Sequence, residues 1–216
     1  KALATVNSRR DPAKCPCRAA YTAIREHFDY PVFGSPELWA RKTDLVQRGP
    51  ATADEYLRFR HAFLYHGTSA FDPVGWMPPS PTIETDGVRI GTDKLSHFFL
   101  NGPWLESAYR SALKHGDDIE EATRRAIAFA IFTERTVLGA SSSGIVSLGD
   151  LEANYQGFLF FRGLCDGPDP DLTRTPEGWR LARPFDLRNY VTPEWDESWQ
   201  PNIYTASRWA KVKPVM

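Results

Sequence analysis

Three observations predict that this chain is mainly α, a single-domain helical bundle with a small β-hairpin. Apolar residues recur with the period of a helix in several long windows. One dipeptide, Asp86-Gly87, lies between two short strand-like segments and fits a tight hairpin turn. The length of 216 residues suffices for one large domain or two small ones, and we expect residues 1–216 to form one domain.

Three helices are expected near the N-terminus, over residues 17–28, 36–48 and 52–64. The first has apolar residues at helical spacing on one face. The second has Ser35 as its N-cap, a proline at its first position and Gly49 as its stop. The third begins with a threonine and a glutamate spaced as in a capping box.

The segment from residue 66 to 92 contains four prolines and cannot form a long helix. Within it, residues 82–84 and 88–90 can form short strands on either side of Asp86-Gly87. We therefore place the hairpin here.

The remaining elements are expected to form the functional half of the chain. We predict a helix over residues 93–115 that is interrupted at Gly102-Pro103, a second over 117–138, and a third over 150–163. Residues 144–148 can form a strand. Residues 93–163 are then the catalytic core, and residues 164–216, rich in proline and aromatic residues, form an extension that wraps it.

The cysteines and the first residue bear on localisation. A bridge within Cys15-Pro-Cys17 would be strained, so Cys15 or Cys17 is expected to pair with Cys165, the alternative being three unrelated thiols. The sequence begins at Lys1 rather than at a methionine, which a removed signal peptide would explain. Both features favour an oxidising compartment, and we expect a periplasmic or secreted protein.

Composition excludes several classes of partner. The formal net charge is −1, so the whole chain lacks an electrostatic footprint for nucleic acid or for an anionic membrane. No apolar run approaches the roughly 18 residues that a membrane span needs. We expect no nucleic-acid partner, no membrane span, no cofactor and a monomeric state.

Glu134 is the first candidate for chemistry, because it lies near the end of an apolar helix and before a loop rich in serine and glycine. Helical periodicity places Ile127, Ile131 and Leu138 on its face, and we expect these three residues to be buried. A carboxyl group among apolar side chains has a raised pKa and can act as a general acid. The alternative is a salt bridge, for which the adjacent Arg135 is poorly placed.

Asp93 and His97 form a second candidate pair. They are four residues apart, so both project from one helix face. Asp93 or Thr92 is expected to cap this helix. His97 can be a base, a metal ligand or a hydrogen-bond donor to a buried carboxylate, or else a satisfied core histidine beside two phenylalanines.

Asp150 and Asn154 form a third pair with the same spacing. Asp150 fits a helix cap or a first-turn residue, and capping alone would explain it. Asn154 lies inside an otherwise apolar helix, where a buried amide must find partners. Gly157 on this helix indicates the close approach of another backbone.

The order of these residues resembles a pattern in VanZ-like proteins and in small envelope lipoproteins with a D-K-x-x-H signature. The resemblance covers residues 93–163 and consists of Asp93, Lys94, His97, Glu134, Ser147, Asp150, Asn154 and Gly157. It implies a cell-envelope role and one shared polar site. Those relatives are mostly embedded in membranes, whereas the segment 104–125 of this chain is charged.

A second resemblance is architectural. A helix, a terminal Glu, a short hairpin with serines and glycines, and another helix are similar to the core of lysozyme-like glycosidases and lytic transglycosylases. This resemblance implies that Glu134 protonates the glycosidic oxygen and that the hairpin lines the cleft. A second carboxylate would have to come from Asp150 or Asp93. Substrate contacts are then expected from Ser141, Ser142, Ser143, Ser147, Asn154 and Tyr155.

The sequence thus leads to one main hypothesis and two alternatives. The main hypothesis is a cell-envelope hydrolase of lysozyme type that cleaves peptidoglycan glycan strands or a related amino-sugar polymer, with Asp93, His97, Glu134 and Asp150 as catalytic residues. The first alternative is a periplasmic binding or scaffold protein whose polar cluster is structural. The second is a metal-dependent hydrolase, although H-E-x-x-H, C-x-x-C and calcium-loop motifs are absent from the sequence, and we predict no metal ligands.

Overall fold

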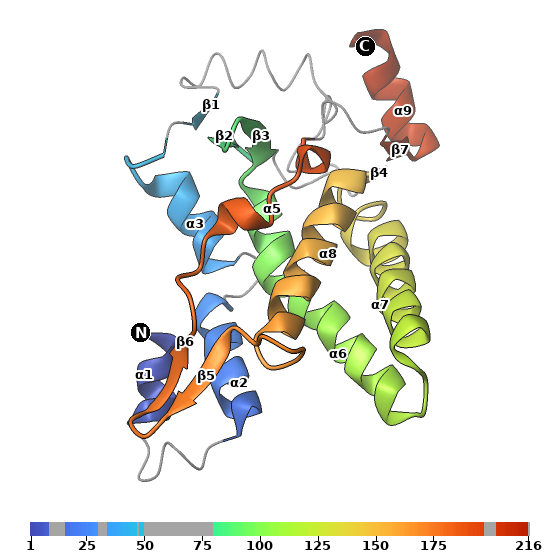
Figure 1. Ribbon diagram of the computed structural model, residues 1–216. Coiled ribbons are helices and arrows are strands. Elements are labelled where there is room, and N and C mark those ends of the chain that lie inside the picture. Colours follow the sequence, from blue (N-terminus) through green and yellow to red (C-terminus); the bar gives the residue numbers. More distant parts are fainter. Residues whose placement is uncertain (9–15, 30–33, 47, 50–79, 197–201, 216) are drawn as a thin grey trace.

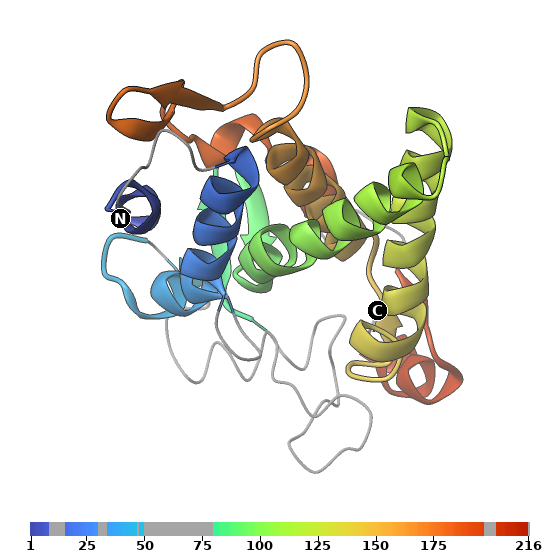
Figure 2. The same cartoon turned by 90° about the horizontal axis from the view of Figure 1, so that it is seen from below.

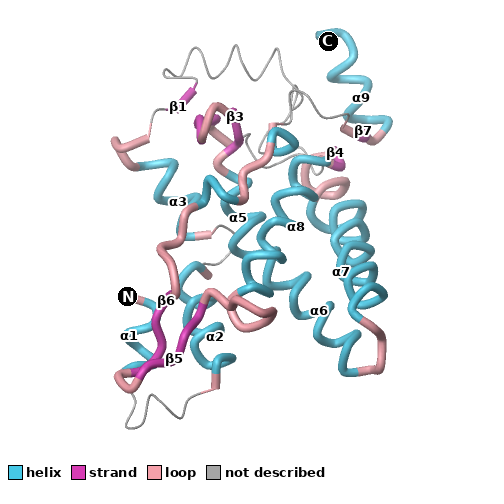
Figure 3. Tube along the Cα trace, in the orientation of Figure 1, coloured by secondary structure: helices cyan, strands magenta, loops and turns pink. Residues whose placement is uncertain are grey.

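The computed structural model describes residues 1–8, 16–29, 34–46, 48–49, 80–196 and 202–215. Within these residues the protein is mainly α with small β-sheets, as the sequence predicts (Figures 1 and 3). The helix predicted over residues 52–64 and the segment 66–79 lie outside the described residues. No helix in the described part is long and apolar enough to cross a membrane.

The N-terminal part contains α1 (Ala2–Asn7), α2 (Cys17–Phe28) and α3 (Ser35–Lys42). The predicted bounds of α2 are confirmed. The prediction for α3 is wrong at its C-terminal end, because the helix ends at Lys42 and Arg48–Gly49 forms strand β1 instead. Its N-cap is Gly34 rather than Ser35.

The predicted hairpin is confirmed as β2 (Thr82–Thr85) and β3 (Val88–Gly91), which pair antiparallel. Strand β1 joins the other side of β2, giving a sheet with the order β1-β2-β3. The turn residues Asp86 and Gly87 have φ values of 53° and 78°. Two left-handed residues in succession give the hairpin a backbone twist that matches its strands, and Asp-Gly adopts this conformation readily.

Residues 93–163 form three helical segments, in which α6, α7 and α8 pack side by side (Figure 1). The first segment is continuous rather than interrupted at Gly102-Pro103, because a π-helical turn adds a residue before the proline and Pro103 occupies the first turn of α6. The elements are α5 (Asp93–Ser96), η2 (His97–Asn101), α6 (Gly102–Lys114), α7 (Ile119–Thr133), η3 (Glu134–Leu138), β4 (Ile145–Val146) and α8 (Leu148–Gly163).

The C-terminal extension contributes to the core. Its elements are the hairpin β5 (Leu172–Thr175) and β6 (Gly178–Leu181), the 3₁₀ turns η4 (Leu187–Asn189) and η5 (Pro193–Trp195), β7 (Ile203–Tyr204), α9 (Ala206–Val212) and η6 (Lys213–Val215). Trp179 and Trp195 are buried in the main core, and the ring of Trp195 lies 5.9 Å from that of Phe98 in η2. Asn7 of α1 exchanges two hydrogen bonds with the backbone of Trp179, at 2.8 and 2.9 Å.

The loop between η3 and α8 differs from the hairpin that the lysozyme resemblance implies. Strand β4 pairs with β7, almost 60 residues further along the chain, and not with its own sequence neighbours. The backbone N–H of Thr205 also donates to the carbonyl of Gly144 at 2.9 Å. The C-terminal extension therefore holds this loop in place.

A disulfide bond and a cluster of hydrogen bonds and ion pairs hold α2 against α6 and the residues after α8. Cys17 forms a disulfide with Cys165, as one of the two predicted pairings requires. The fully buried Glu106 of α6 accepts hydrogen bonds from Arg18 at 2.8 Å and from Tyr21 at 2.9 Å, and it also pairs with Arg110. A buried carboxylate needs this many donors to offset its lost hydration.

The helices η2 and α8 cross at Gly157, which confirms the predicted close approach. A Cβ atom on Gly157 would overlap the carbonyl oxygen of Phe98, and one on Gly102 would lie 2.7 Å from the Cα of Gly157. This crossing sets the distance between the helix that bears His97 and the helix that bears Asp150 and Asn154.

We predict that Gly157→Ala lowers the free energy of unfolding by about 1–3 kcal/mol, because the added methyl group forces the two backbones apart. Chemical denaturation followed by circular dichroism measures the change. Gly163→Ala, at the end of the same helix, is the matched control, since its Cβ would meet only Asp171 at 3.5 Å. Equal stability of the two variants would contradict the role of the crossing.

Candidate functional site

Three segments bring together the acidic and basic residues that the sequence singled out. Helix α5 and the π turn η2 carry Asp93, Lys94 and His97, whereas α8 carries Asp150 and Asn154. Glu134 begins the π turn η3. His97 likewise begins η2, so both residues stand where a helix widens by one residue, a feature frequent at functional sites.

The ammonium group of Lys94 joins the two aspartates. Its Nζ lies 2.6 Å from Oδ1 of Asp150 and 3.1 Å from Oδ2 of Asp93. The lysine side chain is fully buried, while those of Asp93 and Asp150 remain 28% and 10% exposed. Burial alone would raise the pKa of Asp93, but the charges of Lys94 and His97 outweigh it and lower that pKa below its ordinary value.

Asp150 is free for this pairing because another residue caps its helix. The hydroxyl of Ser147 is the N-cap group of α8 and accepts a hydrogen bond from the N–H of Asp150 at 3.1 Å. Asp150 stands in the first helical turn, one of the two positions that the sequence allowed. Its carboxylate is therefore directed to Lys94 and His97.

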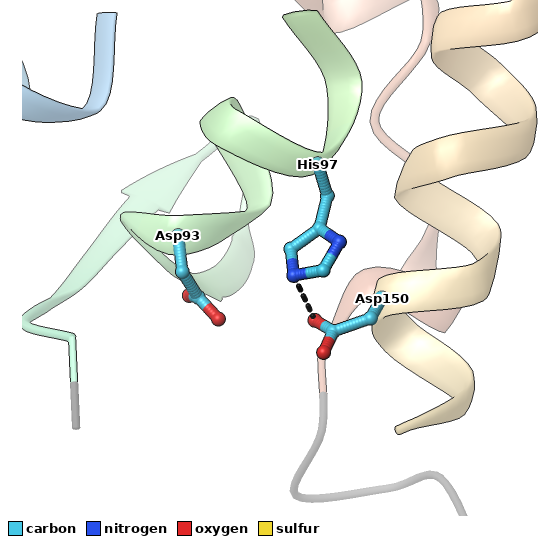
Figure 4. A group of neighbouring side chains, drawn as sticks. All are labelled: Asp93, His97 and Asp150. Carbon is cyan, nitrogen blue, oxygen red and sulfur yellow. Dashed lines mark ion pairs between the residues drawn. The ribbon is translucent and has the colours of Figure 1, made fainter. Parts of the chain in front are cut away.

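His97 has partners at both ring nitrogens. Nε2 lies 3.3 Å from Oδ1 of Asp150, and Figure 4 shows the imidazole directed at that carboxylate with Asp93 on the other side. Nδ1 lies 3.0 Å from the amide oxygen of Asn154 and 3.0 Å from the amide nitrogen of Asn101. Burial opposes the charged imidazolium, yet Asp150 and Glu134 outweigh it and raise the pKa of His97.

The two amides at Nδ1 serve two protonation states. When Nδ1 carries a proton, it donates to Asn154. When it is bare, it accepts a hydrogen bond from Asn101. In both states Nε2 carries its proton and faces Oδ1 of Asp150 at 3.3 Å. A proton can therefore enter or leave Nδ1 without rotation of the ring, an arrangement suited to a residue that transfers protons.

Glu134 is fully buried, as expected of a carboxyl group with a raised pKa, but its neighbours differ from those predicted. It continues the alanine face of α7, whereas Ile127 and Ile131 point outward and are 38% and 39% exposed. Gly139 packs against Glu134 so closely that a Cβ atom there would overlap the carboxyl group. One carboxyl oxygen, Oε1, accepts a hydrogen bond from the N–H of Ser147 at 3.2 Å.

Burial raises the pKa of Glu134 from 4.5 to about 8, with a further contribution from the negative charge of Asp150. His97, the N–H of Ser147 and Lys94 act in the opposite direction and do not cancel it. Glu134 therefore holds a proton at neutral pH, in the same cluster as Asp93, whose pKa is lowered.

Four buried polar atoms of this region have no hydrogen-bond partner among the described residues: Oγ1 of Thr92, Oε2 of Glu134, Oδ1 of Asp150 and Nδ2 of Asn154. Oδ1 of Asp150 has ion pairs with Lys94 and His97. A buried network whose only role is structural tends to be fully satisfied, because each unpaired group costs roughly 1–3 kcal/mol. These atoms can form a hydrogen bond with a further group.

Metal binding was the chemical alternative for these residues. One ligand atom from each of Asp93, His97 and Asp150 lies within 4.8 Å of the others, a spacing compatible with an ion. Lys94 already supplies a positive charge to both carboxylates, and a divalent ion would have to displace or repel that ammonium group.

The serines that were predicted to contact substrate bond instead to their own loop. Ser141 donates to the carbonyl of Thr136, while Ser142 and Ser143 donate to that of Gly139. Ser147 caps α8 and is buried. Tyr155 packs beside Phe158 in the hydrophobic cluster between α6, α7 and α8, with ring centroids 6.0 Å apart.

Sequence reasoning left two members of this group, Lys94 and Asn101, out of the proposed site. Lys94 belongs to the D-K-x-x-H string, and a lysine next to a helix-capping aspartate reads as solvent-exposed. Asn101 follows His97 at helical spacing, which was the available signal.

No protein-family model, curated protein or solved structure matches this chain. The two resemblances drawn from the sequence therefore remain predictions, and function is argued from the geometry of the site.

We predict that Glu134 makes stability fall as pH rises. Its pKa is higher in the folded state than in the unfolded state. Its favourable contribution to the free energy of unfolding is therefore fully present below a pH of about 4.5 and is lost as the pH rises through about 8. The slope from this group is up to about 1.4 kcal/mol per pH unit between those limits. Urea denaturation at several pH values should show it in the wild type but not in Glu134→Gln. Glu120→Gln, an exposed glutamate of α7, is the control and should keep the slope.

We also predict that Asp150→Asn lowers the free energy of unfolding by about 3 kcal/mol, because the buried ammonium of Lys94 loses its nearer carboxylate. Replacing both partners, Lys94→Met with Asp150→Leu, should recover part of the loss, since no buried ammonium group is then left unpaired, although Asp93 and His97 each lose a charged partner. Asp166→Asn, which breaks a more exposed pair with Arg110, should cost less than about 1 kcal/mol. A similar loss in all three variants would argue against the role given to Lys94.

Proposed function

We propose that this protein is a cell-envelope hydrolase that cleaves a glycosidic bond of peptidoglycan or a related amino-sugar polymer by acid–base catalysis. The observation that carries the proposal is the environment of His97, whose Nδ1 has one hydrogen-bond acceptor and one donor while Nε2 is held by Asp150. The Cys17–Cys165 disulfide supports an oxidising compartment.

The division of roles follows from exposure. His97, Asp150 and Asp93 are partly accessible to solvent, whereas Glu134 is enclosed. His97 in its charged form would protonate the leaving oxygen of the glycosidic bond, and the ionised Asp93 or Asp150 would take a proton from the attacking water. Glu134 keeps a proton at neutral pH and would act through His97, whose pKa its charge raises when that proton leaves.

This assignment modifies the sequence-based hypothesis that Glu134 itself protonates the substrate. Direct transfer requires the carboxyl group to come within hydrogen-bond distance of the glycosidic oxygen. Glu134 has no exposed surface, being covered by Gly139 and the start of α8. A residue at the accessible side of the cluster is better placed for that step.

The enclosure of Glu134 favours a second candidate, a binding or scaffold protein in which the cluster fixes the packing of α5, η3 and α8. The hydrogen bond that Glu134 accepts from the N–H of Ser147 joins η3 to the start of α8, which is a structural contact. In that case the variants would change stability and the wild type would release no fragments from the polymer.

The test uses purified sacculi, with the soluble fragments identified by mass spectrometry. We expect the wild type to release glycan fragments and His97→Gln to reduce the rate by about 100-fold or more, because the proton carrier is lost. Glu134→Gln should change the pH dependence of the rate, since it removes a charge that acts on His97. Activity should persist in the presence of a chelator, because Lys94 rather than a metal ion neutralises the aspartates.

Glu120→Gln, the same substitution at an exposed position of α7, should retain full activity. The proposal would be wrong if the folded wild type released no fragments at any pH, and the scaffold interpretation would then stand. Full activity of a folded His97→Gln variant would instead remove the role given to His97.

A further inference from the structure

In the second half of helix α7, the small apolar side chains face the core and the large ones face outward. Its inner face consists of small residues, and Ala122, Ala126 and Ala130 are at most 3% exposed. Large apolar residues point outward, and Phe132 is 62% exposed. In the stretch from Ala126 to Thr133 every outward position is apolar, at Ile127, Ala128, Phe129, Ile131 and Phe132.

This arrangement is costly for a helix that faces water. The alanines allow α7 to pack closely on α6 and α8, while the large side chains lie outside this contact and stay 37–62% exposed. Contiguous exposed apolar surface on a soluble protein typically marks a site of interaction with a partner or a membrane. We therefore expect these side chains to contact something other than the hydrophobic core of the described residues.

Further exposed apolar residues lie on η3 and on the C-terminal extension. Val137 in η3 is exposed, as are Ile203 of β7 and Trp209 of α9. Pairing of β4 with β7 brings these elements together, and Nε of Arg208 donates to the carbonyl of Ser143 at 2.8 Å. Figure 1 shows α9 beyond the C-terminal end of α7, with β4 and β7 between them. Figure 2 shows both elements on the same side of the molecule. We call this surface the apolar end, formed by Ile127, Phe129, Ile131, Phe132, Val137, Ile203 and Trp209.

The residues around the apolar end are basic. Residues 135–149 and 202–215 contain no Asp or Glu. They contain the exposed Arg135, Lys211 and Lys213, besides the buried Arg208. The acidic residues of α7 lie in its first turn, where Glu120 and Glu121 pair with Arg124. The charged residues of α7, including its two arginines, thus pair in its first half, and its second half is uncharged. The basic residues near the apolar end come from η3 and from residues 208–213.

We propose that the apolar end docks on the surface of a lipid bilayer that contains anionic lipids. Exposed Phe, Ile and Trp side chains beside Lys and Arg are the combination by which peripheral proteins bury apolar surface among acyl chains and attract anionic headgroups. A second copy of the chain fits less well, because a symmetric interface would place the basic residues of one copy near those of the other. The near-neutral charge of the whole chain averages over this local separation.

The experiment is flotation of the intact protein with vesicles of phosphatidylcholine alone and with vesicles that also contain phosphatidylglycerol. We expect binding to the anionic vesicles that weakens at high salt. Phe132→Asp with Ile203→Asp removes apolar contacts, and Arg135→Glu with Lys213→Glu reverses two charges. Each pair should reduce the bound fraction by about tenfold or more. All four positions are exposed, so circular dichroism should show unchanged folding.

Ile119→Asp is the matched control, because Ile119 is 67% exposed at the opposite end of the same helix and should not affect vesicle binding. The proposal is overturned if the wild type does not float with anionic vesicles, or if either double variant binds them as well as the wild type does. A dimer in light scattering that Phe132→Asp converts to monomers, without vesicle binding, would also overturn it in favour of a second copy. None of these outcomes depends on hydrolase activity.

Discussion

The salt bridge of the buried Lys94 with Asp93 and Asp150 is the contact on which the rest of the site depends. It connects α5, which follows the small sheet, to the first turn of α8. An ammonium group without solvent must keep its carboxylates close, because the cost of an unpaired buried charge is several kcal/mol. The positions of both aspartates are thereby fixed, and with Asp150 fixed, the imidazole of His97 acquires its partner at Nε2.

The close crossing at Gly157 complements this ionic contact. Helices η2 and α8 approach until backbone meets backbone, so His97 and Asn154 lie within hydrogen-bond distance even though their side chains are short. Glu134 enters from the third segment and meets the capped end of α8 at Ser147. Its burial keeps it protonated beside ionised aspartates, and the site then holds groups of clearly different proton affinity.

Helix α7 links the site to the outer surface. Its alanine face continues into Glu134, and its opposite face bears isoleucine and phenylalanine at the surface. Periodicity reveals that one face of a helix is apolar, but it does not say which of two apolar faces is inside. The choice here was made by packing distance, since α6 and α8 leave room for alanine methyl groups and not for larger side chains.

The sequence by itself determined the mainly α class, the Asp86-Gly87 hairpin, α2, and the pairing of Cys165 with an N-terminal cysteine, because these depend on local periodicity, turn chemistry and covalent geometry. It also singled out Asp93, His97, Glu134, Asp150 and Asn154, since polar residues at helical spacing in apolar segments are conspicuous. Tertiary structure alone decided the partner of β4, the burial of Lys94 and the outward direction of Ile127 and Ile131. These features arise between segments far apart in the chain, where the burial of each group depends on which neighbours the fold brings to it.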